Sequence, residues 1–170
     1  MKTLIFLILE GLALFTVSCG QAGKEEESKE RPAIGLYAEV IPAKELLFAE
    51  DDIISFNLAT REIIFTDVAA KRLSSCSFDG YSTSMNLFLN GERLFKSAIY
   101  LVCGFSSFRI DDLVFYRSVE EDSRYYLNDG YPLDIYSDEI RKIREKNAQK
   151  RKIEWNTFVD HLSKADKIIK

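Results

Sequence analysis

The stretch TSMNLFLNGERLFKSA, residues 83–98, carries the clearest local structural signal of the chain. Asn90-Gly91 tolerates the positive φ that both central positions of a type I′ turn require, so two strands should meet there in a tight hairpin. In that register Leu89 lies opposite Glu92, and large apolar side chains occupy both faces, which favours a place inside a sheet. The two predicted faces are Met85, Leu87, Leu89 and Leu94 on one side, and Phe88 with Phe95 on the other.

Further strand signals lie on both sides of this hairpin. Runs of β-branched and aromatic residues bounded by turn residues are typical of strands. Pro42 should end the first of these runs, because proline lacks a ladder donor. Asn128-Asp129-Gly130 should turn the chain after the last one. Besides the hairpin, the predicted strands span residues 34–40, 53–57, 62–66, 99–103, 113–116 and 124–127.

Two segments carry helical signals. Residues 67–73 predict a short helix with Asp67 as its N-cap. Residues 137–170 contain no Gly or Pro and predict one long helix capped by Ser137. The section from 144 to 152 has almost no apolar residue and should be solvated all round, or nearly so. The apolar positions at helical spacing are Ile153, Trp155, Phe158, Val159, Leu162 and Ile169.

Together these elements predict an α+β fold. Short links between successive strands favour a mainly antiparallel sheet, here of about six strands, with one short helix and a long C-terminal helix. Residues 32–170, 139 in all, suffice for a single domain with its own core. We therefore expect a single α+β domain at 32–170, ending in the helix 137–170.

The first eighteen residues have the parts of an export signal. Lys2 precedes a short apolar core, and small residues precede Cys19. The core is about fifteen residues long, fewer than the roughly 20 that a membrane-spanning helix needs. Thr16-Val17-Ser18-Cys19 resembles the lipobox of bacterial lipoproteins, although Thr16 stands where Leu is usual. This resemblance implies a lipoprotein signal peptide over 1–18 and acylation of Cys19, palmitate included; plain secretion and a buried N-terminal helix are the alternatives.

The residues after Cys19 are small or charged. Such a segment buries too little apolar surface to offset its ordering entropy, so we expect a flexible acidic tether over 19–31. Its acidic cluster resembles the surface-export signal of lipoproteins of the Bacteroidota, and a linker without a signal is the alternative. With its β-rich domain and charged C-terminal helix, the chain resembles the small lipoproteins of unknown function of that phylum. The resemblance implies a bacterial cell-envelope protein, lipid-anchored at the outer membrane, with surface exposure left open.

The charge distribution limits the classes of partner that the chain is expected to bind. The chain carries a net charge of −4, while residues 137–170 hold ten Lys and Arg against six Asp and Glu. An exported, acidic protein is not expected to bind nucleic acid. The basic run within 141–152 is either a solvated helix face or a contact for lipid headgroups or a charged glycan.

The sequence shows no catalytic, cofactor or metal signature. His161 is the one histidine, and no second His or Cys pair stands at ligand spacing. Neither a phosphate-binding glycine loop nor a nucleophile elbow is present. The acidic pairs at 51–52, 111–112 and 120–122 lack the glycine of a calcium loop. We therefore expect no enzyme, no cofactor and no metal, with an envelope enzyme of unrecognised site as an alternative.

Two residue sets remain as candidate features. Cys76 and Cys103 either form a disulfide in an oxidising envelope or stay as two thiols. A tyrosine cluster around residues 128–132 either covers a sheet edge or forms an interaction surface for a protein or a sugar. Function is accordingly expected to be that of a binding or interaction module, with accessory glycan binding as an alternative. The cluster comprises Tyr125, Tyr126, Tyr131 and Tyr136.

Overall fold

The computed structural model describes residues 32, 34–76, 83–103, 109–118, 124–132 and 137–170. The expected signal peptide at 1–18 and the expected tether at 19–31, Cys19 included, lie outside these residues. Within the described residues the chain is α+β, as predicted.

The helices and strands alternate more often than the sequence indicated. Three α-helices are present in the described residues, α1 (Asp67–Ser75), α2 (Asp138–Lys150) and α3 (Lys152–Lys164), with a short 3-10 turn, η1 (Glu50–Asp52). The strands are β1 (Leu36–Ile41), β2 (Leu46–Ala49), β3 (Ile53–Asn57), β4 (Glu62–Phe65), β5 (Ser84–Leu89), β6 (Glu92–Arg93), β7 (Ile99–Cys103), β8 (Arg109–Arg117), β9 (Tyr125–Tyr131) and β10 (Ile168–Ile169).

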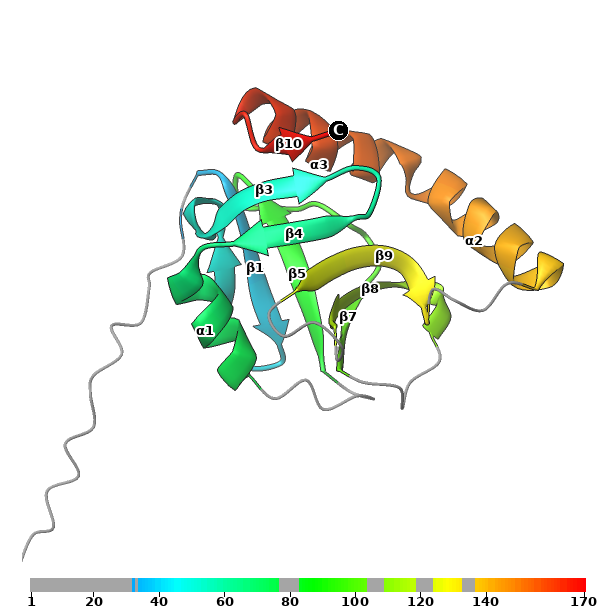
Figure 1. Ribbon diagram of the computed structural model, residues 1–170, viewed down its shortest axis with the longest axis horizontal. Helices are drawn as coiled ribbons and strands as arrows, with labels where there is room; N and C mark the ends of the chain where they lie inside the picture. Colours follow the sequence, from blue (N-terminus) through cyan, green and yellow to red (C-terminus); the bar gives the residue numbers. More distant parts are fainter. Residues whose placement is uncertain (1–31, 33, 77–82, 104–108, 119–123, 133–136) are drawn as a thin grey trace, which may run out of the picture.

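These strands form one mixed sheet. Its order is β10-β3-β4-β9-β8-β7-β5-β1-β2, with β6 paired to β5. The sheet curls, so that β3 and β4 lie across β1 and β5 (Figure 1). Most neighbours are antiparallel, but β7 pairs with β8 in parallel and β10 pairs with β3 in parallel. The expectation of about six antiparallel strands was therefore too simple, because neither parallel pair has a local sequence signal.

The hairpin at Asn90-Gly91 is present as predicted. Both residues have positive φ, 52° and 80°, and Leu89 pairs with Glu92. Its expected division of faces was wrong for Phe95, which is buried in the main core together with Met85. Phe88 lies on the other face, where its ring stacks on Tyr37. Since β6 ends at Arg93, Phe95 follows the strand and is free of its alternation.

The structure corrects three local predictions. The N-cap of α1 is Thr66 and not Asp67, because the Thr66 hydroxyl accepts from Ala69 N–H. Asn128-Asp129-Gly130 does not turn the chain but continues β9 along β8. The sequence did not predict two short strands, β2 and β10. Strand β2 pairs with β1, and β10 pairs with β3.

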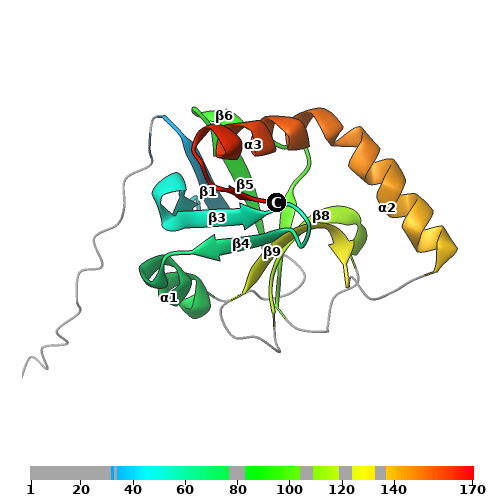
Figure 2. The same cartoon turned by 45° about the horizontal axis from the view of Figure 1, so that its top comes forward.

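The C-terminal region is two helices rather than one. Ser137 caps α2 as predicted, accepting from Ile140 N–H at 3.2 Å. The helix axis breaks at Arg151, after which α3 packs over the curled sheet while α2 extends beyond it (Figure 2). Past α3, Asp166 adopts a positive φ of 56° and Lys167 N–H donates to the Leu162 carbonyl. These two features end the helix, and the chain continues as β10.

One main core lies between the curled sheet and α3. Aromatic rings from distant strands of the sheet meet in this core: the ring centroids of Phe48 in β2 and Phe65 in β4 are 5.0 Å apart. Phe158 and Leu162 of α3 are fully buried in the same cluster, as the predicted apolar face requires. Ile153, predicted for that face, is 82% exposed, because it lies two residues before Trp155 in the same helix and so points to roughly the opposite side of α3.

Candidate binding cleft at the α2–α3 junction

Helix α2 contacts the sheet through polar side chains. Asn147 is the residue of α2 that is buried, and its amide donates to the Asp111 carboxylate of β8 at 3.1 Å. Lys150 in turn donates to the Asn147 side-chain oxygen at 3.3 Å. Residues 144–152 were expected to be solvated all round or nearly so, and Asn147 departs from this, because its amide nitrogen bonds the sheet and its oxygen accepts from Lys150.

Arg151 joins three separate segments at the break between the helices. Its guanidinium forms an ion pair with Asp129 of β9 at 2.6 Å and donates to the Asp111 carbonyl at 2.8 Å. Its Nε donates to the Ser97 hydroxyl at 3.4 Å. Because the Arg151 and Asp129 side chains are only 12% and 20% exposed, this pair is little screened by water.

Gly130 allows α2 to approach the sheet. Its φ is +88°, and an added Cβ would lie 2.9 Å from the Ile110 carbonyl oxygen and 3.0 Å from Arg144 Nε. Arg144 passes over this glycine and donates to the Pro132 carbonyl. A side chain at position 130 would occupy the space that the Arg144 guanidinium now uses.

Gly130→Ala should therefore destabilise the protein by about 2–4 kcal/mol, the sum of a positive-φ cost and crowding against backbone. Gly91→Ala is the matched control, since Gly91 has φ +80° but nothing within 4 Å of an added Cβ. It should cost only about 1–2 kcal/mol, the positive-φ part alone. Urea denaturation of both variants measures the difference; equal losses would mean that Arg144 does not need the glycine.

A polar cleft of about 470 Å³ opens beside this network. Three cationic and two anionic side chains reach it, together with one hydroxyl and one amide. Glu154 is held in place on one wall, because its carboxylate accepts from the Lys96 backbone N–H at 3.3 Å. We call this site the α2–α3 cleft; its lining residues are Lys96, Ser97, Asp111, Asn147, Lys150, Arg151 and Glu154.

A second cationic group lies behind Asp129. The Arg61 guanidinium stacks on the Trp155 ring of α3 at 4.0 Å, and its buried Nη1 has no hydrogen-bond partner among the described residues. Burial lowers the pKa of Arg61, and the negative charge of Asp129 partly opposes that change. Asp129 therefore interacts with two cations, and its ion pair holds Arg151 in position beside the cleft.

The predicted tyrosine set does not form one exposed platform. Tyr125 is fully buried in the main core, and Tyr131 is buried in a small cluster on the outer face of the sheet. Tyr126 is half-buried and stacks on Tyr116 at 4.9 Å. Tyr136 lies outside the described residues. Of the three described members, Tyr126 alone is not buried.

The two domain cysteines lie at the same end of the fold. Cys76 follows α1, packs against the main core and contacts the Arg72 carbonyl through its sulfur. Cys103 is the last residue of β7 and pairs with Arg117 of β8. The Arg117 guanidinium donates to the Ser74 carbonyl at 3.0 Å, which brings the backbone at 103 near the end of α1. Both alternatives, the disulfide and two thiols, stay open.

His161 is engaged in a structural contact. Its Nε2 lies 2.8 Å from the Glu50 carboxylate, which also accepts from Leu36 N–H at 3.0 Å. Burial raises the pKa of Glu50, but the hydrogen bonds from His161 and Leu36, with the charges of His161 and Lys167, offset it, so the pKa lies below its ordinary value. The pair links the start of β1 to α3.

The acidic pairs do not converge. Asp52 forms an ion pair with Arg72, Asp111 belongs to the α2–α3 cleft, and residues 120–122 are outside the described part of the chain. Among the described residues there is no group of three or more His, Cys, Asp or Glu side chains placed to hold a metal ion. Likewise, none of the described helices is long and apolar enough to cross a membrane.

Sequence reasoning did not find the α2–α3 cleft. Its residues come from the segment after β6, from β8 and from the two C-terminal helices, so no short motif contains them. The fold and this cleft define an α+β protein with a curled mixed sheet and a polar, mixed-charge site. Comparisons with protein-family models, with curated proteins and with solved structures find no match to this chain.

Proposed function

We propose that this chain is a lipid-anchored protein of a bacterial cell envelope that acts as a binding module, and that its partner binds in the α2–α3 cleft. The anchor is Cys19, on the strength of the residues before it. The single observation that carries the binding site is the cleft itself, with five charged side chains around about 470 Å³.

The cleft suits a polar partner that carries charge. Lys96 and Lys150 present ammonium groups, while Asp111 and Glu154 present carboxylates. Sites of this kind select partners of complementary charge, and the same charges raise the rate of association. The lining hydroxyl, Ser97, accepts from Arg151 and has no histidine among the other lining residues to act as its base, which favours recognition over catalysis by an activated serine.

The site is also held in position before any partner arrives. Arg151 is fixed by Asp129, the Asp111 carbonyl and Ser97, and Asn147 is fixed by Asp111. Preorganised side chains lose little entropy on binding, which is what a recognition site needs. No aromatic ring lines the cleft, so a protein partner fits it better than a stacked sugar ring.

The test is photo-cross-linking in the native envelope. A benzoylphenylalanine placed at Ser97, in the cleft, should give a discrete adduct, while the same group at exposed Ser163 should not. Adding Lys96→Glu should reduce the Ser97 adduct by about tenfold, the effect of losing roughly 1.4 kcal/mol of complementary charge. Lys142→Glu, an exposed charge reversal on α2, should leave it unchanged.

The adduct also separates the alternatives. The adduct is heavier than the chain by the mass of the cross-linked partner. If protease removes that additional mass, the partner is a protein; if only glycan hydrolysis removes it, the partner is a glycan. An adduct pattern that is the same from Ser97 and Ser163, or that falls equally with Lys96→Glu and Lys142→Glu, contradicts the proposed site.

A further inference from the structure

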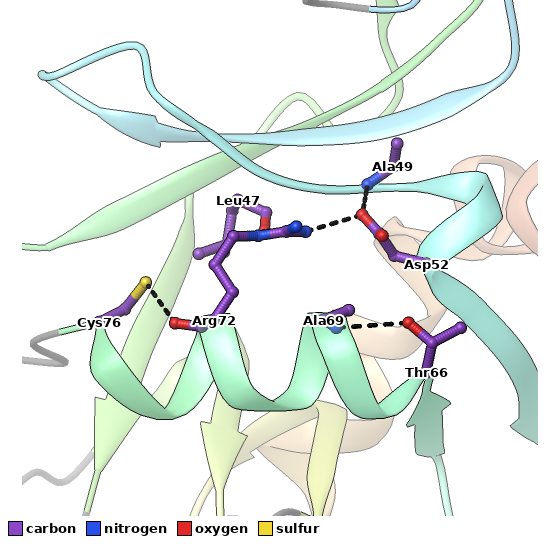
Figure 3. A network of polar contacts seen from close by, with 7 residues as sticks. All are labelled: Leu47, Ala49, Asp52, Thr66, Ala69, Arg72 and Cys76. Carbon is purple, nitrogen blue, oxygen red and sulfur yellow. Dashed lines mark hydrogen bonds and ion pairs between the residues drawn. The ribbon is translucent and has the colours of Figure 1, made fainter. Parts of the chain in front are cut away.

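Strand β2 lies at an edge of the sheet. Two of its backbone groups that do not pair with β1 are hydrogen-bonded by side chains instead. In the described sheet β2 pairs with β1 alone. On its other side the Leu47 carbonyl accepts from Arg72, at 3.2 Å from Nη2 and 3.4 Å from Nε. The Ala49 N–H donates to the Asp52 carboxylate at 2.9 Å (Figure 3).

One ion pair supplies both contacts. Arg72 of α1 and Asp52 of η1 lie 2.8 Å apart, with side chains that are 28% and 5% exposed. The same Asp52 oxygen accepts from both Arg72 and Ala49 N–H (Figure 3). We call this arrangement the β2 clasp: it presents a donor to Leu47 and an acceptor to Ala49, as a neighbouring strand would.

The strand itself is short and its pairing with β1 is irregular, with a register shift between Ala38 and Glu39 of β1, but its side chains give the edge no protection. Edge strands commonly avoid pairing with other chains through charged residues, proline or bulges pointing at the free side. The β2 sequence, Leu-Leu-Phe-Ala over Leu46–Ala49, has neither a charge nor a proline. Charge at this edge therefore comes from outside the strand, from Asp52 of η1 and Arg72 of α1.

The two clasped groups are also the ones that a second copy of the strand would use. In an antiparallel β2 pair about a twofold axis, with Phe48 opposite Phe48 of the second copy, Leu47 lies opposite Ala49. As a hydrogen-bonded pair, Ala49 N–H of each copy then donates to the Leu47 carbonyl of the other. Because β2 is self-complementary in this register, its free edge is suited to a second copy of this chain.

We propose that the Arg72–Asp52 clasp is an edge guard: it keeps this chain from pairing along β2, and its loss turns the β2 edge into a dimerisation site for a second copy. The inference is independent of what binds in the α2–α3 cleft, which lies on β8, α2 and α3.

The test compares two charge-removing variants of one helix. Arg72→Met removes the clasp donor, and Lys71→Met makes the same chemical change at the exposed neighbouring residue. The full chain is studied by analytical ultracentrifugation in density-matched detergent over a range of concentrations. Arg72→Met should self-associate about tenfold or more tightly than the parent, as two regained backbone hydrogen bonds imply, while Lys71→Met should behave as the parent.

Hydrogen exchange locates the contact. In Arg72→Met the Ala49 amide should exchange more slowly as protein concentration rises, because it becomes part of an inter-chain ladder. Circular dichroism checks that the variant is folded; if it is not, Asp52→Ala, which removes the carboxylate that accepts from Ala49 N–H and from Arg72, is held to the same criteria. A folded clasp variant that stays monomeric, an unchanged Ala49 exchange rate, or equal association of Lys71→Met overturns the proposal.

Discussion

Phe158→Ala is expected to lower the free energy of unfolding by about 3–5 kcal/mol, the usual range for emptying a packed aromatic site. The Phe158 ring is 1% exposed and lies 5.2 Å from the ring of Phe56 and 5.6 Å from that of Trp155. It is thus the contact through which α3 closes the open side of the curled sheet. Because its neighbours come from β3 and from α3 itself, they are unable to collapse fully into the vacated space.

Guanidinium denaturation measures this loss from the midpoint and slope of unfolding. Ile153→Ala is the matched control on the same helix; with its side chain 82% exposed, it should stay within about 0.5 kcal/mol of the parent. An unchanged midpoint for Phe158→Ala would mean that α3 does not dock through this face. Its apolar stripe would then be a surface for a partner or a membrane.

Elements with a local chemical cause could be predicted from the sequence. Asn90-Gly91 sets its own turn, since few other dipeptides accept positive φ twice. Ser137 starts α2 through one side-chain hydrogen bond within its own first turn. The Phe158 and Leu162 stripe depends only on helical spacing, and it is buried as expected.

Elements held by distant contacts could not be predicted in this way. Gly130 has the positive φ of a turn residue, yet Asn128-Asp129-Gly130 forms strand, because pairing with β8 outweighs the local preference. The four residues of β2 are too short for a periodic signal. The break at Arg151 has no Gly or Pro to mark it, and the contacts that hold Arg151 are made with Asp111 and Asp129.

The α2–α3 cleft was missed for a related reason. A polar residue on a helix face gives the same sequence pattern whether water or the sheet satisfies it. Asn147 is bonded to Asp111, 36 residues earlier in the chain, and only the fold brings them together. The same holds for the β2 clasp, in which Asp52 and Arg72 are 20 residues apart.

The largest change is expected at the proposed anchor, Cys19. Each buried acyl methylene contributes about 0.8 kcal/mol to membrane binding, and one chain alone holds a protein only reversibly. Lipoprotein cysteines of the kind that Cys19 resembles carry more than one chain, so removing the acceptor sulfur should abolish stable membrane attachment rather than weaken it. Cys19→Ser should therefore move the protein almost completely from the membrane fraction to the soluble fraction.

Membrane fractionation with radiolabelled palmitate tests this expectation. The parent should be labelled and sediment with membranes, and Cys19→Ser should be unlabelled and soluble. Cys76→Ser is the matched control, because it removes a thiol from the folded domain and leaves the proposed lipid acceptor in place. It should keep both label and membrane attachment. Equal labelling of the parent and Cys19→Ser contradicts acylation at this residue, whereas an unlabelled, soluble parent favours the alternative of plain secretion, in which Thr16 in place of Leu prevents lipobox processing.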